Sequence, residues 1–207
     1  MQIELLEDRG FCYKGANPMN TCLIVIDVQE SFRHRPYFTE QDVPAYLAAQ
    51  NALIEGAQAQ GIPIVRIFHV EGPKEVGNPW AVESGHIRPL EGLKNFDPAV
   101  TFTKSRHSAL VGTALGVWLT QNGIQKIIVS GIRTEQCCET TARHASDLGF
   151  AVDYVLDATL TWDMPCADGS LLTALLIKQR TATVLQDRFA DVVSVKDALE
   201  RTHERTH

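Results

Sequence analysis

The chain has 207 residues, of which 44% are apolar and 21% charged, and its formal net charge is -6 at pH 7. These values are ordinary for a soluble globular protein of one large domain. Lysine and arginine form no basic cluster, and no apolar run reaches the length of about 18 residues that a membrane helix needs. We therefore expect neither a nucleic-acid partner nor a membrane span. The first residues lack the basic and apolar regions of a signal peptide, which predicts a cytoplasmic protein.

Short apolar runs alternate with amphipathic helical patterns along the chain. The runs predict strands at 23–26, 62–68, 100–103, 126–130, 152–156 and 182–185. The patterns between them predict helices at 44–60, 108–121, 137–148 and 170–179. Runs without polar alternation are typical of parallel strands buried on both faces, and strand–helix alternation gives right-handed βαβ units. The whole chain, 1–207, is therefore expected to form one α/β domain with a core at about 20–195.

The segment 69–97 interrupts this alternation, and it carries five glycine and proline residues in its first half. Irregular segments of this length inside a compact domain are often functional lids. A solvated surface insertion would give the same pattern. The sequence leaves both interpretations open.

Three reactive side chains fall at the ends of predicted strands, where ligands bind in open parallel sheets. Asp27 follows the first strand, Lys104 follows the third, and Cys137 opens the helix after the fourth. Taken alone, each has an ordinary structural interpretation: a capping aspartate, a solvated lysine and a buried thiol. Because the carboxyl ends of parallel strands share one edge of the sheet, we expect the three to lie close together.

The combination suits nucleophilic catalysis. A helix N-terminus and a nearby lysine both favour a thiolate. A carboxylate beside them can accept the thiol proton and later donate it to a leaving group. Backbone N–H groups at the same helix start can bind an oxyanion.

Three motifs in this order resemble those of isochorismatase-like cysteine hydrolases. The run Gly131-Ile132-Arg133-Thr134-Glu135-Gln136-Cys137-Cys138 resembles the nucleophile segment of that family. Asp27-Val28-Gln29 with Phe32 resembles its first-strand motif, and Thr103-Lys104-Ser105-Arg106 resembles its lysine segment. Their order and spacing match over roughly residues 20–195.

The resemblance implies a Rossmann-like three-layer sandwich with helices on both faces of a six-stranded parallel sheet in the order 3-2-1-4-5-6. It implies a catalytic triad of Asp27, Lys104 and Cys137, and a thioester intermediate. It also implies a cis peptide bond between Ile132 and Arg133, with the backbone N–H groups of Arg133 and Cys137 forming the oxyanion hole.

Several residues depart from the family pattern or compete with the triad. Cys138 is the rival nucleophile, but the family spacing selects Cys137, and Cys138 fits a small core side chain. The metal-binding Asp-x-His motif of nicotinamidases has no counterpart here, so we predict no metal and no cofactor. Arg133 stands where small residues are usual, and its side chain could bind a substrate carboxylate or pair with Glu135 or Glu139.

Phe32, His69, Trp80 and Arg133 are the expected substrate contacts, although a lone histidine such as His69 is as often structural. An odd number of cysteines, five, without a secretory signal argues against a disulfide framework. A strained disulfide between the vicinal Cys137 and Cys138 is the one pairing considered.

The leading functional hypothesis is hydrolysis of a C–N bond in a small amide, carbamoyl or ureido compound. Two alternatives stay open: vinyl-ether hydrolysis of the isochorismatase type with Asp27 as the acid, and a catalytically idle member that serves as a binding or scaffold protein. A dinucleotide-binding protein is excluded because no glycine-rich turn follows the first strand. The apolar helix 108–121, with Trp118, predicts a dimer or larger homo-oligomer.

Overall fold

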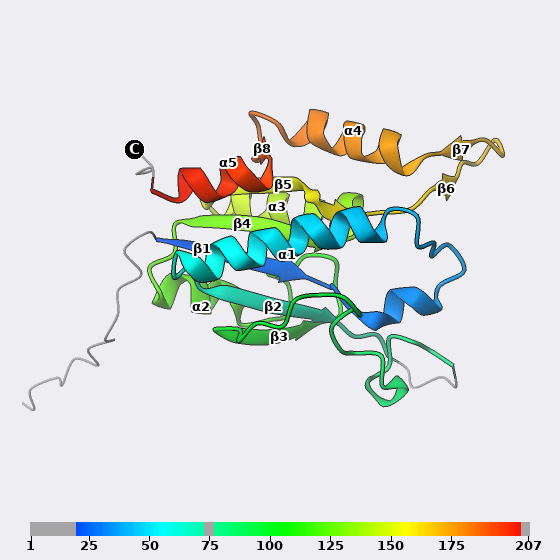
Figure 1. Cartoon of the computed structure of the whole chain (residues 1–207), viewed down its shortest axis with the longest axis horizontal. Coiled ribbons are helices and arrows are strands. Elements are labelled where there is room, and N and C mark those ends of the chain that lie inside the picture. Colours follow the sequence, from blue (N-terminus) through cyan, green and yellow to red (C-terminus); the bar gives the residue numbers. More distant parts are fainter. Residues whose placement is uncertain (1–19, 73–76, 204–207) are drawn as a thin grey trace, which may run out of the picture.

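The computed structural model describes residues 20–72 and 77–203, and these form a sheet with helices on both faces (Figure 1). The elements follow one another as β1 (Thr21–Ile26), η1 (Glu30–His34), α1 (Val43–Ala59), β2 (Ile64–His69), η2 (Val82–Ser84), β3 (Val100–Lys104), α2 (Leu115–Gln121), β4 (Lys126–Ile132), η3 (Thr134–Cys138), α3 (Glu139–Asp147), β5 (Ala151–Leu160), β6 (Met164–Pro165), β7 (Leu171–Leu172), α4 (Ala174–Leu185), β8 (Asp191–Val193), α5 (Val195–Glu200) and η4 (Arg201–His203).

The main sheet has six strands in the order β3-β2-β1-β4-β5-β8, and every neighbouring pair is parallel. Because β8 is the sixth strand of this sheet along the chain, the predicted order 3-2-1-4-5-6 is confirmed. Strands β6 and β7 form a separate antiparallel ribbon outside it.

Side chains of the central strands alternate between two apolar clusters. On β1, Leu23 and Val25 pack on the face covered by α1 and α5, whereas Ile24 and Ile26 pack on the face covered by α2 and α3. All four side chains are at most 1% exposed. Burial of such a side chain stabilises the fold by about 1.5–3 kcal/mol, so both helical layers are anchored through the middle of the sheet.

The predicted strand at 182–185 is wrong, because these residues form the last turn of α4. A short apolar run fits a buried strand and a helix face equally well, and the cap decides between them. The side chain of Thr173 accepts a hydrogen bond from the N–H of Leu176 and starts a helix that continues to Leu185. The sixth strand is β8, which is only three residues long.

The predicted helix 108–121 is shorter than expected, since α2 begins at Leu115. Gly112 has a φ of +70°, a left-handed conformation that an α-helix cannot contain. Ser108 is therefore not a helix cap; its hydroxyl lies 2.9 Å from Nδ1 of His144 on α3. The predicted helix 137–148 also changes: Cys137 lies in the π-helical turn η3, and α3 starts at Glu139.

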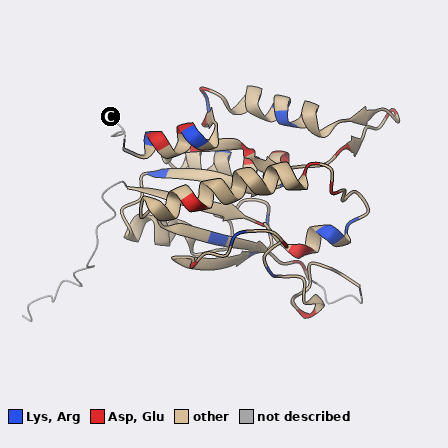
Figure 2. Ribbon diagram, viewed as in Figure 1, with Lys and Arg blue, Asp and Glu red and all other residues tan. Residues whose placement is uncertain are grey.

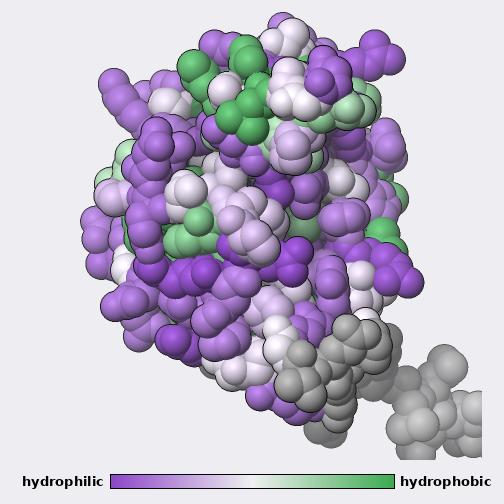
Figure 3. Space-filling model, turned by 90° about the vertical axis from the view of Figure 1, so that its right-hand side faces the viewer, coloured by the Kyte–Doolittle hydropathy of each residue, from purple (hydrophilic) through white to green (hydrophobic). Residues whose placement is uncertain are grey.

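The surface of the described residues is mixed in charge, and the face drawn in Figure 3 carries an apolar area at its top. Lysine and arginine lie interspersed with aspartate and glutamate along the ribbon (Figure 2). No helix among the described residues is long and apolar enough to cross a bilayer. Four leucines of β7 and α4 are exposed, and this part of the molecule forms an apolar area at the top of Figure 3: Leu171, Leu172, Leu175 and Leu176.

Candidate active site

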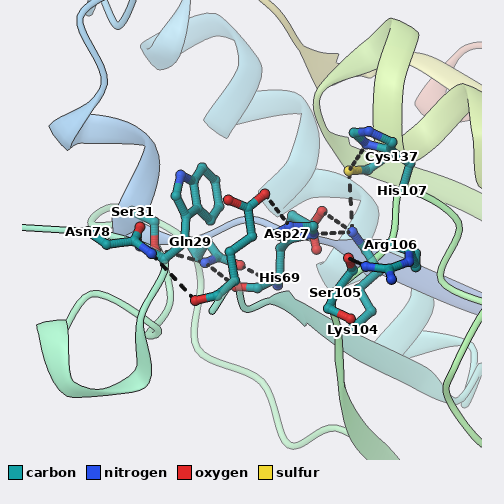
Figure 4. A network of polar contacts seen from close by, with 12 residues as sticks. Asp27, Gln29, Ser31, His69, Asn78, Lys104, Ser105, Arg106, His107 and Cys137 are labelled. Carbon is teal, nitrogen blue, oxygen red and sulfur yellow. Dashed lines mark hydrogen bonds and ion pairs between the residues drawn. The ribbon is translucent and has the colours of Figure 1, made fainter. Parts of the chain in front are cut away.

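Three side chains meet at the carboxyl edge of the sheet (Figure 4). Asp27 follows β1, Lys104 is the last residue of β3, and Cys137 lies in η3 after β4. The Lys104 Nζ donates to Asp27 Oδ2 at 2.6 Å and to Cys137 Sγ at 3.2 Å. The side chains of Lys104 and Asp27 are fully buried, and Cys137 is 7% exposed. The structure therefore brings together the three residues selected from the predicted strand ends.

The backbone between β1 and β4 fixes the position of the carboxylate and of the turn that carries the thiol. Asp27 has a φ of +52°, in the left-handed region that aspartate tolerates better than most residues. Gly131 has a φ of +129°, and a Cβ there would lie 2.0 Å from the carbonyl oxygen of Ile26. Any side chain at position 131 would push the end of β4 away from β1, and η3 with it.

A second set of contacts holds Lys104 and His69. His69 Nδ1 lies 3.0 Å from Lys104 Nζ, and its Nε2 lies 3.0 Å from Glu71 Oε1. Because an ammonium can only donate, Nδ1 accepts, and Nε2 therefore carries the proton that it donates to Glu71. The three N–H groups of Lys104 are all used, so Lys104 provides a fixed charge here.

The side-chain amide of Gln29 ties the end of β1 to the end of β2. Its oxygen accepts from the N–H of His69 at 2.7 Å, and its nitrogen donates to the carbonyl of His69 at 3.0 Å. The same nitrogen also donates to Ser31 Oγ at 2.8 Å. Gln29 is fully buried. Gln29 is thus a positioning residue for the imidazole that contacts Lys104.

Burial and neighbouring charges set the protonation states. Burial lowers the pKa of Lys104, but the charge of Asp27, together with that of Cys137 when its thiol is ionised, outweighs this effect and raises that pKa above its ordinary 10.5. Burial raises the pKa of the Cys137 thiol, and Asp27 raises it further against the opposing effect of Lys104. Burial first, and then Lys104, lower the pKa of His69. At neutral pH the resting site therefore holds an ammonium, a neutral thiol and a neutral imidazole.

This thiol departs from the expectation that a helix N-terminus and a lysine favour the thiolate. Cys137 lies inside η3, so α3 does not begin at its sulfur. The sulfur is also almost fully buried beside the carboxylate of Asp27, and both effects oppose the anion.

Asp27, His69 and Cys137 are also the group of described residues whose side chains could hold a metal ion, with ligand atoms within 4.8 Å of one another. However, Lys104 Nζ already contacts one atom of each of the three residues. A metal ion here would have to displace a buried ammonium, so the donor set does not fit a metal. The expected absence of a cofactor stays a prediction.

A cavity of about 280 Å³ opens above the thiol and the carboxylate. The Oδ1 of Asp27 is buried, and no described residue forms a hydrogen bond with it. It is therefore available to the thiol or to a bound molecule. The cavity is lined by Asp27, Phe32, Arg35, Tyr37, His69, Glu71, Trp80, His107, Arg133, Gln136 and Cys137.

All four expected substrate contacts line this cavity: Phe32, His69, Trp80 and Arg133. Phe32 and Trp80 pack edge to face, with ring centroids 4.8 Å apart. The segment 69–97 supplies Trp80 and Glu71, and it is attached to the chain after β1 by the hydrogen bond from Leu90 N–H to the carbonyl of Val28. The two interpretations of this segment, a lid and a solvated surface insertion, both stay open, and its residues 73–76 lie outside the described part of the chain.

The Arg133 side chain forms one of the predicted ion pairs, and its role in binding a substrate carboxylate stays a prediction. The peptide bond between Ile132 and Arg133 is cis. Arg133 Nε lies 3.2 Å from Glu135 Oε1, which is one of the two ion pairs considered, yet the guanidinium also borders the cavity. The other candidate, Glu139, pairs with Arg143 and Arg180.

Cys138 lies in the apolar core with 0% exposure, and Cys137 and Cys138 are both free thiols. The fold thus gives only the first of the vicinal pair access to the cavity. Among the residues that sequence reasoning missed, His107 is exposed and its Nδ1 lies 3.8 Å from Cys137 Sγ. Its place three residues after Lys104 was the available signal. The others not selected were Arg35, Tyr37, Glu71 and Gln136.

Several known proteins are similar to this chain in sequence. The chain is 27% identical over 186 residues to an uncharacterized isochorismatase family protein, YrdC, of Bacillus subtilis, covering 89% of this chain and 97% of that protein. It is 29% identical over 150 residues to streptothricin hydrolase of Streptomyces noursei, covering 71% and 57%. It is 39% identical over 90 residues to nicotinamidase 3 of Arabidopsis thaliana, covering 44% and 45%.

Solved structures share the architecture. An isochorismatase from Pseudomonas putida superposes with a TM-score of 0.74 at 26% identity, covering 89% of this chain and 93% of that one. A cysteine hydrolase from Pseudomonas syringae gives 0.79 at 21% identity, covering 90% and 93%, which shows the fold alone. The model of the isochorismatase domain matches residues 21–197, most of the chain. The sheet order and this domain match agree, so the chain belongs to the isochorismatase family of hydrolases.

Proposed function

We propose that the protein hydrolyses a C–N bond in small amide, carbamoyl or ureido compounds, with Cys137 as the nucleophile and Asp27 as the acid–base group. The observation that carries this proposal is the Lys104 ammonium, which bridges Asp27 and Cys137 beneath an open cavity. Two relatives are named as a nicotinamidase and a streptothricin hydrolase, and nicotinamide is itself a small amide.

The first half of the reaction forms a thioester. The Cys137 thiol gives its proton to Asp27 as the sulfur attacks the carbonyl carbon of the substrate, and the carbonyl oxygen becomes an oxyanion. The backbone N–H groups of Arg133 and Cys137 stabilise that oxyanion. When the C–N bond breaks, Asp27 returns the proton to the departing nitrogen. Lys104 stays protonated throughout, because its raised pKa suits a permanent charge.

The second half consumes one water molecule. Asp27, again ionised, takes a proton from the water molecule while the water oxygen attacks the thioester carbon. The carbon–sulfur bond then breaks, the acid product leaves, and the proton on Asp27 returns to the sulfur. The balance is one substrate and one water in, and one carboxylic acid and one amine or ammonia out.

The test is ammonia release over a panel of small amides and ureido acids, combined with acyl-enzyme detection. With the best substrate, intact-mass measurement after rapid quenching should show an adduct on wild-type protein, and peptide mapping should place it on Cys137. The Cys137→Ala variant should form no adduct and release no ammonia, whereas a Cys166→Ala variant, whose thiol is outside the cavity, should behave as wild type.

The same panel separates the alternatives. Vinyl-ether hydrolysis with Asp27 as the acid needs no thiol, so it would survive in Cys137→Ala and fail in Asp27→Asn. A scaffold protein would turn over nothing and would form no adduct. Either result would contradict the proposal.

We also propose that the protein forms a dimer or larger homo-oligomer. Trp118, from which this was expected, is partly buried against the protein's own core, but Leu171 and Leu175 are 57% and 66% exposed in the apolar area of Figure 3. Light scattering that gave a monomer near 22.9 kDa would contradict it. The cytoplasmic location and the absence of a nucleic-acid partner stay predictions, and the first 19 residues lie outside the described part.

A further inference from the structure

Two guanidinium groups contact one aromatic ring that lines the cavity. The Cζ of Arg133 lies 4.7 Å from the centroid of the Tyr37 ring, and the Cζ of Arg35 lies 5.7 Å from it. All three residues line the cavity that contains Cys137. Arg35 and Tyr37 follow η1, whereas Arg133 follows β4, so the fold brings the two cations together from distant parts of the sequence.

Arg133 is held in a fixed orientation. It is 5% exposed, its Nη2 donates to the carbonyl of Trp162 at 3.2 Å, and its Nε donates to Thr161 Oγ1 at 3.3 Å. Nε also forms the ion pair with Glu135. A guanidinium has five N–H donors, and no described residue contacts the Nη1 of Arg133. A preorganised fork with free donors is suited to recognising a planar anion.

Arg35 has no acidic partner among the described residues. It is half-buried, and its Nε is buried without a hydrogen-bond acceptor. Neighbouring Arg33, in contrast, pairs with both Glu30 and Glu40. Buried polar groups in proteins are normally hydrogen-bonded, so the buried Nε–H of Arg35 calls for an acceptor, which an anion bound in the cavity would supply.

The two acidic residues that line the cavity, Asp27 and Glu71, form no ion pair with Arg35 or Arg133 and have other partners. Asp27 pairs with Lys104, and Glu71 pairs with the imidazole of His69. Glu135 offsets only one of the two arginines. The wall formed by Arg35 and Arg133 therefore keeps one positive charge in excess, while Phe32 and Trp80 provide an apolar wall within the same cavity.

We propose that Arg35 and Arg133 form a carboxylate-binding subsite, so that the substrate is a small amide bearing a carboxylate a few bonds from the scissile carbonyl. This inference rests on the proposed function for the role of Cys137, but the subsite itself requires only binding. The carboxylate bridges the two guanidiniums, the short apolar spacer packs against the aromatic wall, and the amide carbon lies over the sulfur. The cavity of about 280 Å³ restricts the class to small molecules.

Binding to the Cys137→Ala variant tests the subsite without turnover. The probes are malonamate, succinamate and glutaramate, each compared by calorimetry with the corresponding neutral diamide. At least one carboxylate should bind about tenfold to a hundredfold more tightly than its diamide, as expected for hydrogen bonds to a charged group. Adding Arg35→Gln to the variant should remove most of this preference. Arg133→Lys, which keeps the charge but loses the fork, should remove part of it.

Arg106→Gln is the matched control, because Arg106 is exposed and does not line the cavity. It should leave the preference unchanged, and thermal unfolding should show that each variant is folded. The subsite is wrong if no carboxylate binds more tightly than its diamide, or if Arg35→Gln and Arg133→Lys both keep the full preference. If the preference is present but the wild-type protein releases no ammonia from any compound of the panel, the proposed function fails and the subsite stands.

Discussion

Two buried lysine–aspartate pairs lie at opposite ends of the same sheet. At the carboxyl end, Lys104 Nζ lies 2.6 Å from Asp27, and at the amino end, Lys126 Nζ lies 2.7 Å from Asp153. Both carboxylates are at most 1% exposed. By distance, charge and burial the two pairs are nearly the same, and yet only one of them is a candidate for catalysis.

The difference is in what surrounds each pair. The Lys126 pair is closed by Arg201, whose carbonyl accepts from Lys126 Nζ at 3.4 Å and whose Nη1 lies 3.8 Å from Asp153. The Lys104 pair instead contacts the thiol of Cys137, and Asp27 lines a cavity. A buried ion pair therefore marks a site only when a nucleophile and an open volume accompany it.

The aspartates give the largest expected contrast. Asp27→Asn should lower kcat by about 10²–10⁴-fold, because the group that moves the proton between thiol, leaving nitrogen and water is lost. Asp153→Asn should leave kcat unchanged, since this residue lies at the other end of the sheet. Ammonia release from the best amide of the panel measures both. An Asp27→Asn protein with wild-type kcat would end the acid–base role of Asp27.

The lysines should give a smaller contrast in rate together with a contrast in stability. Lys104→Met should lower kcat by about 10²–10³-fold, as when one preorganised charged donor is removed. It should also lower the free energy of unfolding by about 3–5 kcal/mol, because Asp27 is left buried and unpaired. Lys126→Met should keep kcat and lose less stability, because Arg201 remains beside Asp153. Turnover numbers per folded molecule measure kcat, and urea unfolding measures stability. Equal losses of kcat in Lys104→Met and Lys126→Met would contradict the distinction between the two pairs.

The sequence predicted the Lys104–Asp27 site because the ends of apolar strands can be recognised locally. Asp27, Lys104 and Cys137 each stand at the end of a recognisable strand, and parallel strand ends share an edge. Arg35 and His107 reach the same cavity from irregular segments, whose course depends on tertiary contacts that no periodicity encodes. The sixth strand, Asp191–Val193, has only three residues, which is too short to give a recognisable apolar run in the sequence. The apolar last turn of α4, at 182–185, was therefore taken for the sixth strand.

The thiols offer a finer contrast. Burial alone raises the pKa of Cys22, whereas Asp27 adds to burial at Cys137 and Lys104 opposes both. Asp27→Asn should therefore speed iodoacetamide alkylation of Cys137 at pH 8, and Lys104→Met should slow it. Cys22 and Cys138, both 0% exposed, should stay unlabelled in the native protein of every variant. Peptide mapping with time gives the rates. Slower labelling of Cys137 in Asp27→Asn would contradict this electrostatic account.

The smallest expected effect is an opposite response of the two ends to acid. The pKa of His69 is lowered from 6.5, so the unfolded chain binds that proton more readily and the contribution of His69 to stability falls as pH drops below 6.5. The pKa of Asp153 is raised from 3.8, first by burial, so the folded chain binds that proton more readily and the contribution of Asp153 to stability grows as pH falls toward 3.8.

Urea unfolding of wild type, His69→Gln and Asp153→Asn at several pH values measures both contributions as differences from wild type. The advantage of wild type over His69→Gln should shrink from pH 7.5 to 5.5, and its advantage over Asp153→Asn should grow from pH 6 to 4. If both stability advantages changed with pH in the same direction, the proposed electrostatic difference between the two ends of the sheet would be wrong.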